Sequence, residues 1–156
     1  YSRTETGGMM LVGTLDPECD VPEWIENPDD FNREVTPERW RAQVYRAALR
    51  MPELAIPSRP KGIADLYDVT EDWIPVYDRS SLDGFYLAVG TSGNQFKNAP
   101  MVGELMAELI VACEAGHDHD RNPVRVVGPV TGHPLDLGFY SRKRTLNPDS
   151  SRTVLG

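Results

Sequence analysis

The sequence predicts an α+β fold with α/β-like features, in which mixed strands accompany two main helices. Two stretches, 36–51 and 98–115, repeat apolar residues at helical spacing. Short apolar runs such as "FYLAV" (85–89) are bounded by glycine, proline and polar residues, as strands usually are. A chain of 156 residues that is 40% apolar and 26% charged has the length and composition of one globular domain.

The first elements are a hairpin and an acidic loop. "YSRT" and "MMLVGT" are strand-like, and Thr6, Gly7 and Gly8 form the turn between them, so residues 1–14 are predicted to be a hairpin. Residues 15–35 are acidic and contain three prolines. Their carboxylates do not have the spacing of an EF-hand, so a solvated loop is favoured over a calcium site.

The first helix is predicted to begin at Thr36, which is a good N-cap, with Pro37 at the first helical position. Pro52 ends it, because proline cannot continue a helix. One side carries an apolar stripe that we interpret as core packing without chemistry of its own. The stripe consists of Trp40, Val44, Ala47, Ala48 and Met51.

Three strands are predicted next, at 63–69, 73–78 and 85–89. The last is an unbroken apolar run without alternation. Such a run indicates a strand covered on both faces, in a parallel or mixed sheet flanked by helices.

The second helix spans 98–115, and Gly116 fits its C′ position. Glu104 and Glu108 mark the wet side, and Gly103 is expected to allow close approach to the sheet. Its buried side is predicted to contain Met101, Val102, Leu105, Met106, Leu109, Ile110 and Cys113.

The remainder, 117–156, is predicted to be an extended C-terminal tail. "HDHDRNP" (117–123) contains two histidines and two acids, but zinc sites need more ligands in a fixed frame, so an exposed polar turn is favoured. "SRKR" (141–144) is the only basic cluster and is interpreted as a solvated turn.

Charge and cysteine content restrict the class of function. A net charge of −8 argues against nucleic-acid or anionic-membrane binding, and no apolar run approaches the ~20 residues of a membrane span. No metal site is predicted. Cys19 and Cys113 lie far apart and are expected to be reduced thiols, which favours a cytoplasmic location.

The most informative stretch is "GTSGNQFKNAP" (90–100), a permissive loop between a predicted strand and the second helix. Gly90 and Gly93 allow a ligand to lie against bare backbone, and helix N–H groups there favour negative charge. Lys97 adds a positive charge and Phe96 a flat apolar wall. The chain contains neither a P-loop nor a G-x-G-x-x-G motif, nor a nucleophile elbow.

Residues 62–110 resemble the C-terminal part of FAD-dependent oxidoreductases of the D-amino-acid oxidase group, which includes sarcosine oxidases, dimethylglycine and sarcosine dehydrogenases and glycine oxidases. Their pattern runs G-L-Y-x-x-T-P-D-x-x-P-I, then G-L-Y-L-A-x-G-F-S-G-H-G-F-K-x-x-P-x-x-G. The opening "YSRTETGGMMLVG" is similar to their Y-x-R-P-E-x-G-G-x-L-x-G hairpin. Matching positions are Tyr67, Thr70, Asp72, Pro75, Gly84, Tyr86, Gly90, Ser92, Gly93, Phe96, Lys97, Pro100 and Gly103.

The resemblance implies a C-terminal fragment of a two-domain enzyme, with 1–61 in the substrate-binding domain and 62–116 in the FAD-binding domain. It implies hydride transfer from an amine or amino acid to the flavin, with Lys97, Asn94 and Tyr67 as catalytic residues. The residues implied to contact FAD are Gly90, Thr91, Ser92, Gly93, Asn94, Gln95, Phe96 and Lys97.

Departures from the pattern limit what it implies. Asn94 and Gln95 replace the family's histidine and glycine, so the resemblance does not imply proton transfer by a histidine here. Residues 64–66 offer no thiol, so FAD is expected to bind non-covalently. The chain starts without methionine and lacks G-x-G-x-x-G. We therefore expect a missing N-terminal half of the fold as partner, an inactive fragment, and dimerisation through an exposed sheet edge.

An alternative of another class stays open at this point. In that alternative the chain is a non-catalytic binding or regulatory module, and the loop at 90–100 serves another ligand or only a tight turn.

Overall fold

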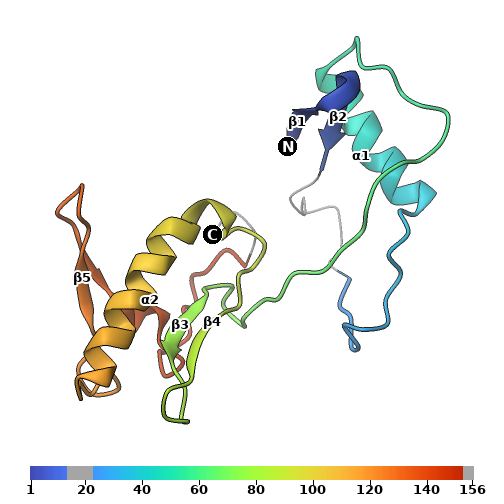
Figure 1. The fold of residues 1–156 in the computed structure, drawn as a ribbon. Helices are drawn as coiled ribbons and strands as arrows, with labels where there is room; N and C mark the ends of the chain where they lie inside the picture. Colours follow the sequence, from blue (N-terminus) through green and yellow to red (C-terminus); the bar gives the residue numbers. More distant parts are fainter. Residues whose placement is uncertain (14–22, 153–156) are drawn as a thin grey trace. The chain divides into compact units, whose positions relative to one another are not determined.

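The computed structural model describes residues 1–13 and 23–152 and divides the chain into two compact units, Tyr1–Leu66 and Tyr67–Gly156. Figure 1 shows the elements of each unit. The fold class is α+β, as predicted: over the described residues, two long helices accompany three two-stranded antiparallel sheets. In the described part of the chain, no helix has both the length and the apolar character needed to cross a bilayer.

Unit 1 opens with the predicted hairpin. Strands β1 (Ser2–Glu5) and β2 (Met9–Val12) pair antiparallel, from Ser2 opposite Val12 to Glu5 opposite Met9. The one-turn helix η1 (Thr6–Gly8) joins them, with φ of 75° at Gly7 and 71° at Gly8. Glycine adopts this left-handed region without strain, which explains the two adjacent glycines in the turn.

Helix α1 (Pro37–Arg50) begins and ends where the sequence predicts. Thr36 is the N-cap, and its carbonyl accepts from the Trp40 N–H at 3.0 Å. At the other end the Met51 N–H donates to the Ala47 carbonyl at 2.9 Å. The predicted apolar stripe is only half-buried, and no side chain of α1 is buried.

In unit 2 the strands are shorter and paired differently than predicted. β3 (Val76–Arg79) and β4 (Tyr86–Val89) form an antiparallel pair, and Ala88 and Val89 are exposed. The expectation of a parallel or mixed sheet covered on both faces is therefore wrong here. The strand predicted at 63–69 is also absent, because Asp68 bonds to the loop after β4 instead of to a ladder.

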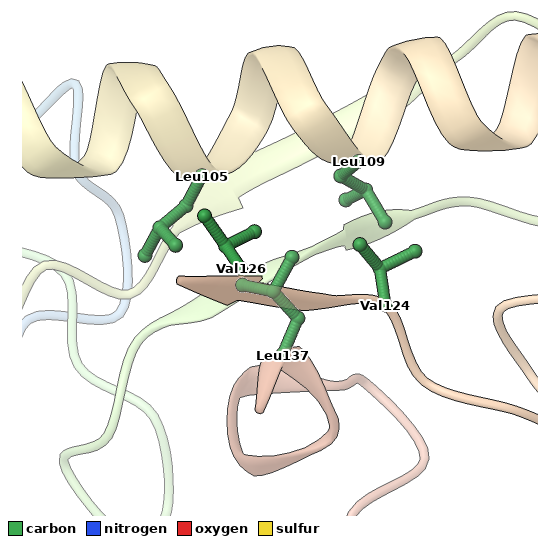
Figure 2. Close-up of a cluster of buried hydrophobic side chains, with 5 residues drawn as sticks. All are labelled: Leu105, Leu109, Val124, Val126 and Leu137. Carbon is green, nitrogen blue, oxygen red and sulfur yellow. The ribbon is translucent and has the colours of Figure 1, made fainter. Parts of the chain in front are cut away.

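The core of unit 2 lies between α2 (Ala99–Glu114) and the elements that follow it: β5 (Arg125–Val127), β6 (Pro134–Asp136) and η3 (Leu137–Tyr140). β5 and β6 pair antiparallel. Figure 2 shows two leucines of the helix pointing toward three side chains of this C-terminal segment. The cluster consists of Leu105, Leu109, Val124, Val126 and Leu137.

The predicted buried side of α2 is confirmed at Leu105 and Leu109, whereas Ile110 is exposed. Gly116 has φ of 90° and its N–H donates to the Cys113 carbonyl at 2.9 Å, as a C′ glycine does. Gly103 does not mediate a close approach, because a Cβ placed there would meet nothing within 4 Å. Cys113 is a free thiol, and Cys19 lies outside the described residues.

Most of the charged side chains in "SRKR" are not solvated, which corrects that prediction. Arg144 and Asp72 form a buried ion pair at 2.6 Å, and the Asn147 N–H also donates to that carboxylate at 3.2 Å. Arg142 binds the buried carboxylate of Asp78 at 3.0 Å. We call this group the ionic cluster; its members are Asp72, Asp78, His119, Asp120, Ser141, Arg142, Lys143 and Arg144.

The turn at 117–123 is exposed at Asp118, Arg121 and Asn122, as predicted, but His119 is buried, which corrects the prediction at that residue. Its Nδ1 accepts from the Val124 N–H at 3.0 Å, and its Nε2 lies 3.5 Å from Asp78 Oδ1. An accepting Nδ1 carries no proton, so the ring is neutral with its proton on Nε2. Burial lowers the pKa of His119, against the opposing effect of Asp78 and Asp120.

Candidate functional site

The loop after β4 folds into a tight turn that presents its backbone. The Asn94 N–H donates to the Thr91 carbonyl at 3.2 Å, and the two central residues, Ser92 and Gly93, have φ of 51° and 72°. Positive φ at both central positions is the signature of a type I′ turn. Gly90 also has a positive φ, of 71°. The conformational freedom predicted from the two glycines is therefore used.

Asp68 holds the start of this loop. Its Oδ1 accepts from the Thr91 hydroxyl at 2.8 Å and from the Thr91 N–H at 3.2 Å, and its Oδ2 accepts from the Gly90 N–H. Its backbone carbonyl accepts from the Ser92 N–H at 2.9 Å. The segment 67–70 thus supports the loop from a distance of more than twenty residues in sequence.

Two further contacts close this support. A Cβ placed on Gly93 would lie 3.3 Å from ring carbons of Tyr67, so the predicted aromatic contacts the predicted turn. A Cβ on Gly90 would lie 2.4 Å from the Thr70 methyl carbon, which leaves no room for a side chain. Tyr67 also meets Trp73 edge to face, with ring centroids 6.2 Å apart. Neither Asp68 nor Thr70 was among the predicted site residues, although both lie within the quoted pattern.

Some predicted contact residues face inward. Ser92 is fully buried, and its hydroxyl donates to the Gly90 carbonyl at 3.2 Å. The side-chain oxygen of Gln95 accepts from the Tyr77 hydroxyl at 2.9 Å and from Asn98 at 3.1 Å, while its amide nitrogen donates to Asn94. These side chains shape the turn, so a ligand would meet mainly its backbone.

The other end of the loop is open and electropositive. Phe96 is 97% exposed, and Lys97 is exposed beside it in η2 (Phe96–Asn98), which runs directly into α2. The N-cap Asn98 makes no side-chain capping bond, and the first turn of α2 contains no acidic residue. The Ala99 N–H already donates to the Phe96 carbonyl and Pro100 has no N–H, so the positive potential here comes from the dipole of α2 and the nearby ammonium. Within the described residues, no acidic side chain pairs with Lys97.

These residues fit an electron-accepting ring that gains negative charge when it is reduced. The turn offers glycine backbone, Phe96 an apolar surface, and Lys97 with the α2 N-terminus positive potential. The amides of Gly90 and Thr91 do not fit this use, because Asp68 already occupies them. A metal is not indicated: the described ranges hold no group of three or more histidine, cysteine or acidic side chains placed to bind one.

Comparison with known proteins gives one result. A family model described as FAD dependent oxidoreductase matches residues 1–109, which include the hairpin, α1, the loop and most of α2. No curated protein matches the chain, and no solved structure does. The match covers more than half of the sequence and contains the whole of the loop described above. The chain therefore belongs to the FAD-dependent oxidoreductase family.

Proposed function

We propose that this chain supplies the flavin-facing loop of an enzyme that oxidises an amine or an amino acid. The observation that carries the proposal is the loop itself: a segment with positive φ at Gly90, Ser92 and Gly93 leads through the exposed Lys97 into a helix whose first turn contains no acidic residue. This loop lies inside the segment that matches the FAD-dependent family. FAD, when bound, supplies the acceptor for a hydride from the carbon beside the substrate nitrogen.

Each predicted catalytic residue has a role in this proposal. Lys97 is exposed at the helix start, where its ammonium holds a substrate carboxylate or stabilises negative charge on the ring. Asn94 orients substrate or ring through hydrogen bonds and transfers no proton, because an amide does not titrate at working pH. Tyr67 lies beside Gly93 with 45% of its surface exposed, and its proposed role is to contact the substrate.

The 156 residues alone are proposed to show no turnover. They contain no G-x-G-x-x-G motif, which is the usual means of holding the diphosphate of a dinucleotide. Binding of the ring by one loop offers few contacts. We therefore expect the isolated chain to bind FAD weakly, and the activity to belong to the natural polypeptide that contains it.

A pair of glycine variants in that natural polypeptide tests the site. Gly93 and Gly84 have φ of 72° and 73°, so valine strains the backbone equally at both positions. Only Gly93→Val alters the proposed flavin surface, and we expect it to abolish the flavin absorbance near ~450 nm that the wild type and Gly84→Val retain. No flavin absorbance in the wild type would refute the proposal.

Lys97→Met tests the charge, with the exposed Lys61→Met as its control. We expect Lys97→Met to lower kcat/KM for the best amine or amino-acid substrate about 10²-fold, the usual effect of losing one charge-stabilising group. Equal activity of the two variants would remove Lys97 from the mechanism.

A further inference from the structure

We propose that Asp68 is a positioning residue. Its carboxylate occupies the Gly90 and Thr91 amides, so that a ligand binds the loop at residues 93–97 instead. This inference rests on the proposed function for the identity of the ligand. The binding of the Gly90 and Thr91 amides by Asp68 is observed in the structure and does not depend on that function.

The carboxylate binds the loop as a bound anion would. Both of its oxygens accept backbone N–H groups, of Gly90 and of Thr91, and one also accepts the Thr91 hydroxyl at 2.8 Å. Adjacent backbone N–H groups that converge on one anion form a common anion-binding arrangement in proteins. Here the anion belongs to the chain, and the neighbouring Asp68 carbonyl secures Ser92 as well, at 2.9 Å.

The state of the carboxyl group agrees with this role. Partial burial raises the pKa of Asp68, but the hydrogen bonds from Thr91 and Gly90 outweigh that effect and leave the pKa below its ordinary value. The group is therefore ionised whenever the protein is near neutral pH. A fixed negative charge at Gly90 and Thr91 repels any second anion there.

The two ends of the loop therefore differ in charge. The Asp68 end is filled and negative, whereas the other end carries Lys97 and the start of α2, whose first turn contains no acidic residue. A ring that gains negative charge is favoured only at the second end. Asp68 thus selects which amides of the loop meet the ligand, without touching the ligand itself.

The test has two arms, and the first needs no flavin. Amide signals of the 156-residue chain are recorded by 1H–15N NMR for wild type, Asp68→Asn and the control Asp65→Asn, whose carboxylate accepts from the neighbouring Leu66 N–H at 2.9 Å. We expect the Gly90 and Thr91 amides to shift in Asp68→Asn alone. In the wild type we expect both amides to follow one titration, with a midpoint below the ordinary value of an aspartate. If Asp68→Asn fails to fold, Thr91→Val replaces it in the test. This variant removes only the hydroxyl donor, so we expect a smaller shift of the same amides.

Unchanged Gly90 and Thr91 signals in Asp68→Asn and Thr91→Val would overturn the proposal. The second arm measures FAD affinity in the natural polypeptide, where we expect Asp68→Asn to raise the Kd about tenfold, or ~1.4 kcal/mol, and Asp65→Asn to leave it unchanged. If Gly93→Val loses FAD while Asp68→Asn binds it normally, the positioning role is wrong and the proposed function stands. If neither variant affects FAD, the proposed function fails.

Discussion

The two units differ in what holds them together. Unit 1, over its described residues, contains half-buried and exposed side chains but no buried one. Unit 2 contains all the buried hydrophobic residues among those that the structure describes, and it also contains the ionic cluster. Both units have helices and hairpins of similar length. The amount of regular secondary structure in a unit of this chain therefore does not indicate how many of its side chains are buried.

The loop at 90–100 is supported by the buried contacts of unit 2. Thr70, whose methyl lies under Gly90, donates to Asp72 at 3.1 Å, and Asp72 is paired with Arg144. The C-terminal segment therefore braces the residues beneath the loop, although it lies beyond the family match at 1–109. We expect substitutions that remove buried contacts to destabilise unit 2 strongly. Comparable substitutions in unit 1 should have little effect on stability.

The largest effect is expected from Arg144→Leu. Its partner Asp72 has only 2% of its side chain exposed, and removing one member of a buried pair leaves an uncompensated charge, at about 3–5 kcal/mol. The matched control is Arg125→Leu, whose pair with Asp136 is exposed and is worth about 0–1 kcal/mol. Urea unfolding of both variants measures the contrast. Equal losses would show that the ionic cluster does not brace unit 2.

Leu109→Ala follows, with Leu49→Ala as its counterpart in unit 1. Leu109 is 0% exposed in the core of unit 2, and truncating a buried leucine costs about 2–5 kcal/mol. Leu49 is 83% exposed on α1, so its loss changes the free energy of unfolding by about 0.5 kcal/mol or less. Hydrogen exchange of the α2 and α1 amides reports the two units separately. A large effect at Leu49 would mean that α1 packs against something in solution.

Gly90→Ala and Gly7→Ala separate backbone strain from packing. Their φ values are 71° and 75°, so alanine adds about 1–2 kcal/mol of left-handed strain at either site. At Gly90 the new methyl also collides with Thr70, whereas at Gly7 it meets nothing within 4 Å. We expect the larger loss at Gly90, measured by urea unfolding. Thr70→Ser, which removes the opposing methyl, should restore part of it.

The smallest effect is a pH dependence confined to unit 2. The pKa of His119 is lowered below its ordinary 6.5 by burial, so the unfolded chain takes up a proton more readily than the folded one. The stabilising contribution is complete above pH 6.5 and declines as pH falls, by at most about 2 kcal/mol between pH 6.5 and 5. Asp72 and Asp120, whose pKa values are lowered chiefly by hydrogen bonds from their basic partners, stabilise the fold above pH 3.8, and this contribution is lost only as the pH falls below that value.

His119→Asn is the variant that checks this dependence, because its amide oxygen can still accept the Val124 N–H without titrating. Its stability should be flat between pH 6.5 and 5. His133→Asn, at an exposed position, should keep the wild-type slope. A slope that survives in His119→Asn would assign the dependence to another group.

Local signals in the sequence were sufficient for part of this fold. The hairpin turn at Gly7 and Gly8, the start of α1 at Pro37 and the C′ glycine of α2 each depend on a residue and its near neighbours. The loop was predictable for the same reason, since its glycines and its position between strand and helix are read in one short window.

The contacts that brace the loop were not predictable, because they join distant residues. Arg144 and Asp72 are 72 positions apart, and Gly90 and Asp68 are 22 apart. Nothing in "SRKR" distinguishes a buried basic cluster from a solvated one when its acidic partners are unknown. For the same reason a strand was predicted at 63–69, although the Asp68 carbonyl there accepts a hydrogen bond from the loop instead of from a neighbouring strand.

The central claim is that the loop at 90–98, and not another glycine turn, meets the flavin. Hydrogen exchange of the natural polypeptide with and without FAD tests it directly, because the turn at 6–8 in unit 1 has the same positive φ and serves as an internal reference. We predict slower exchange at 90–98 when FAD is bound and no change at 6–8. Exchange at 90–98 that does not respond to bound FAD would contradict the account.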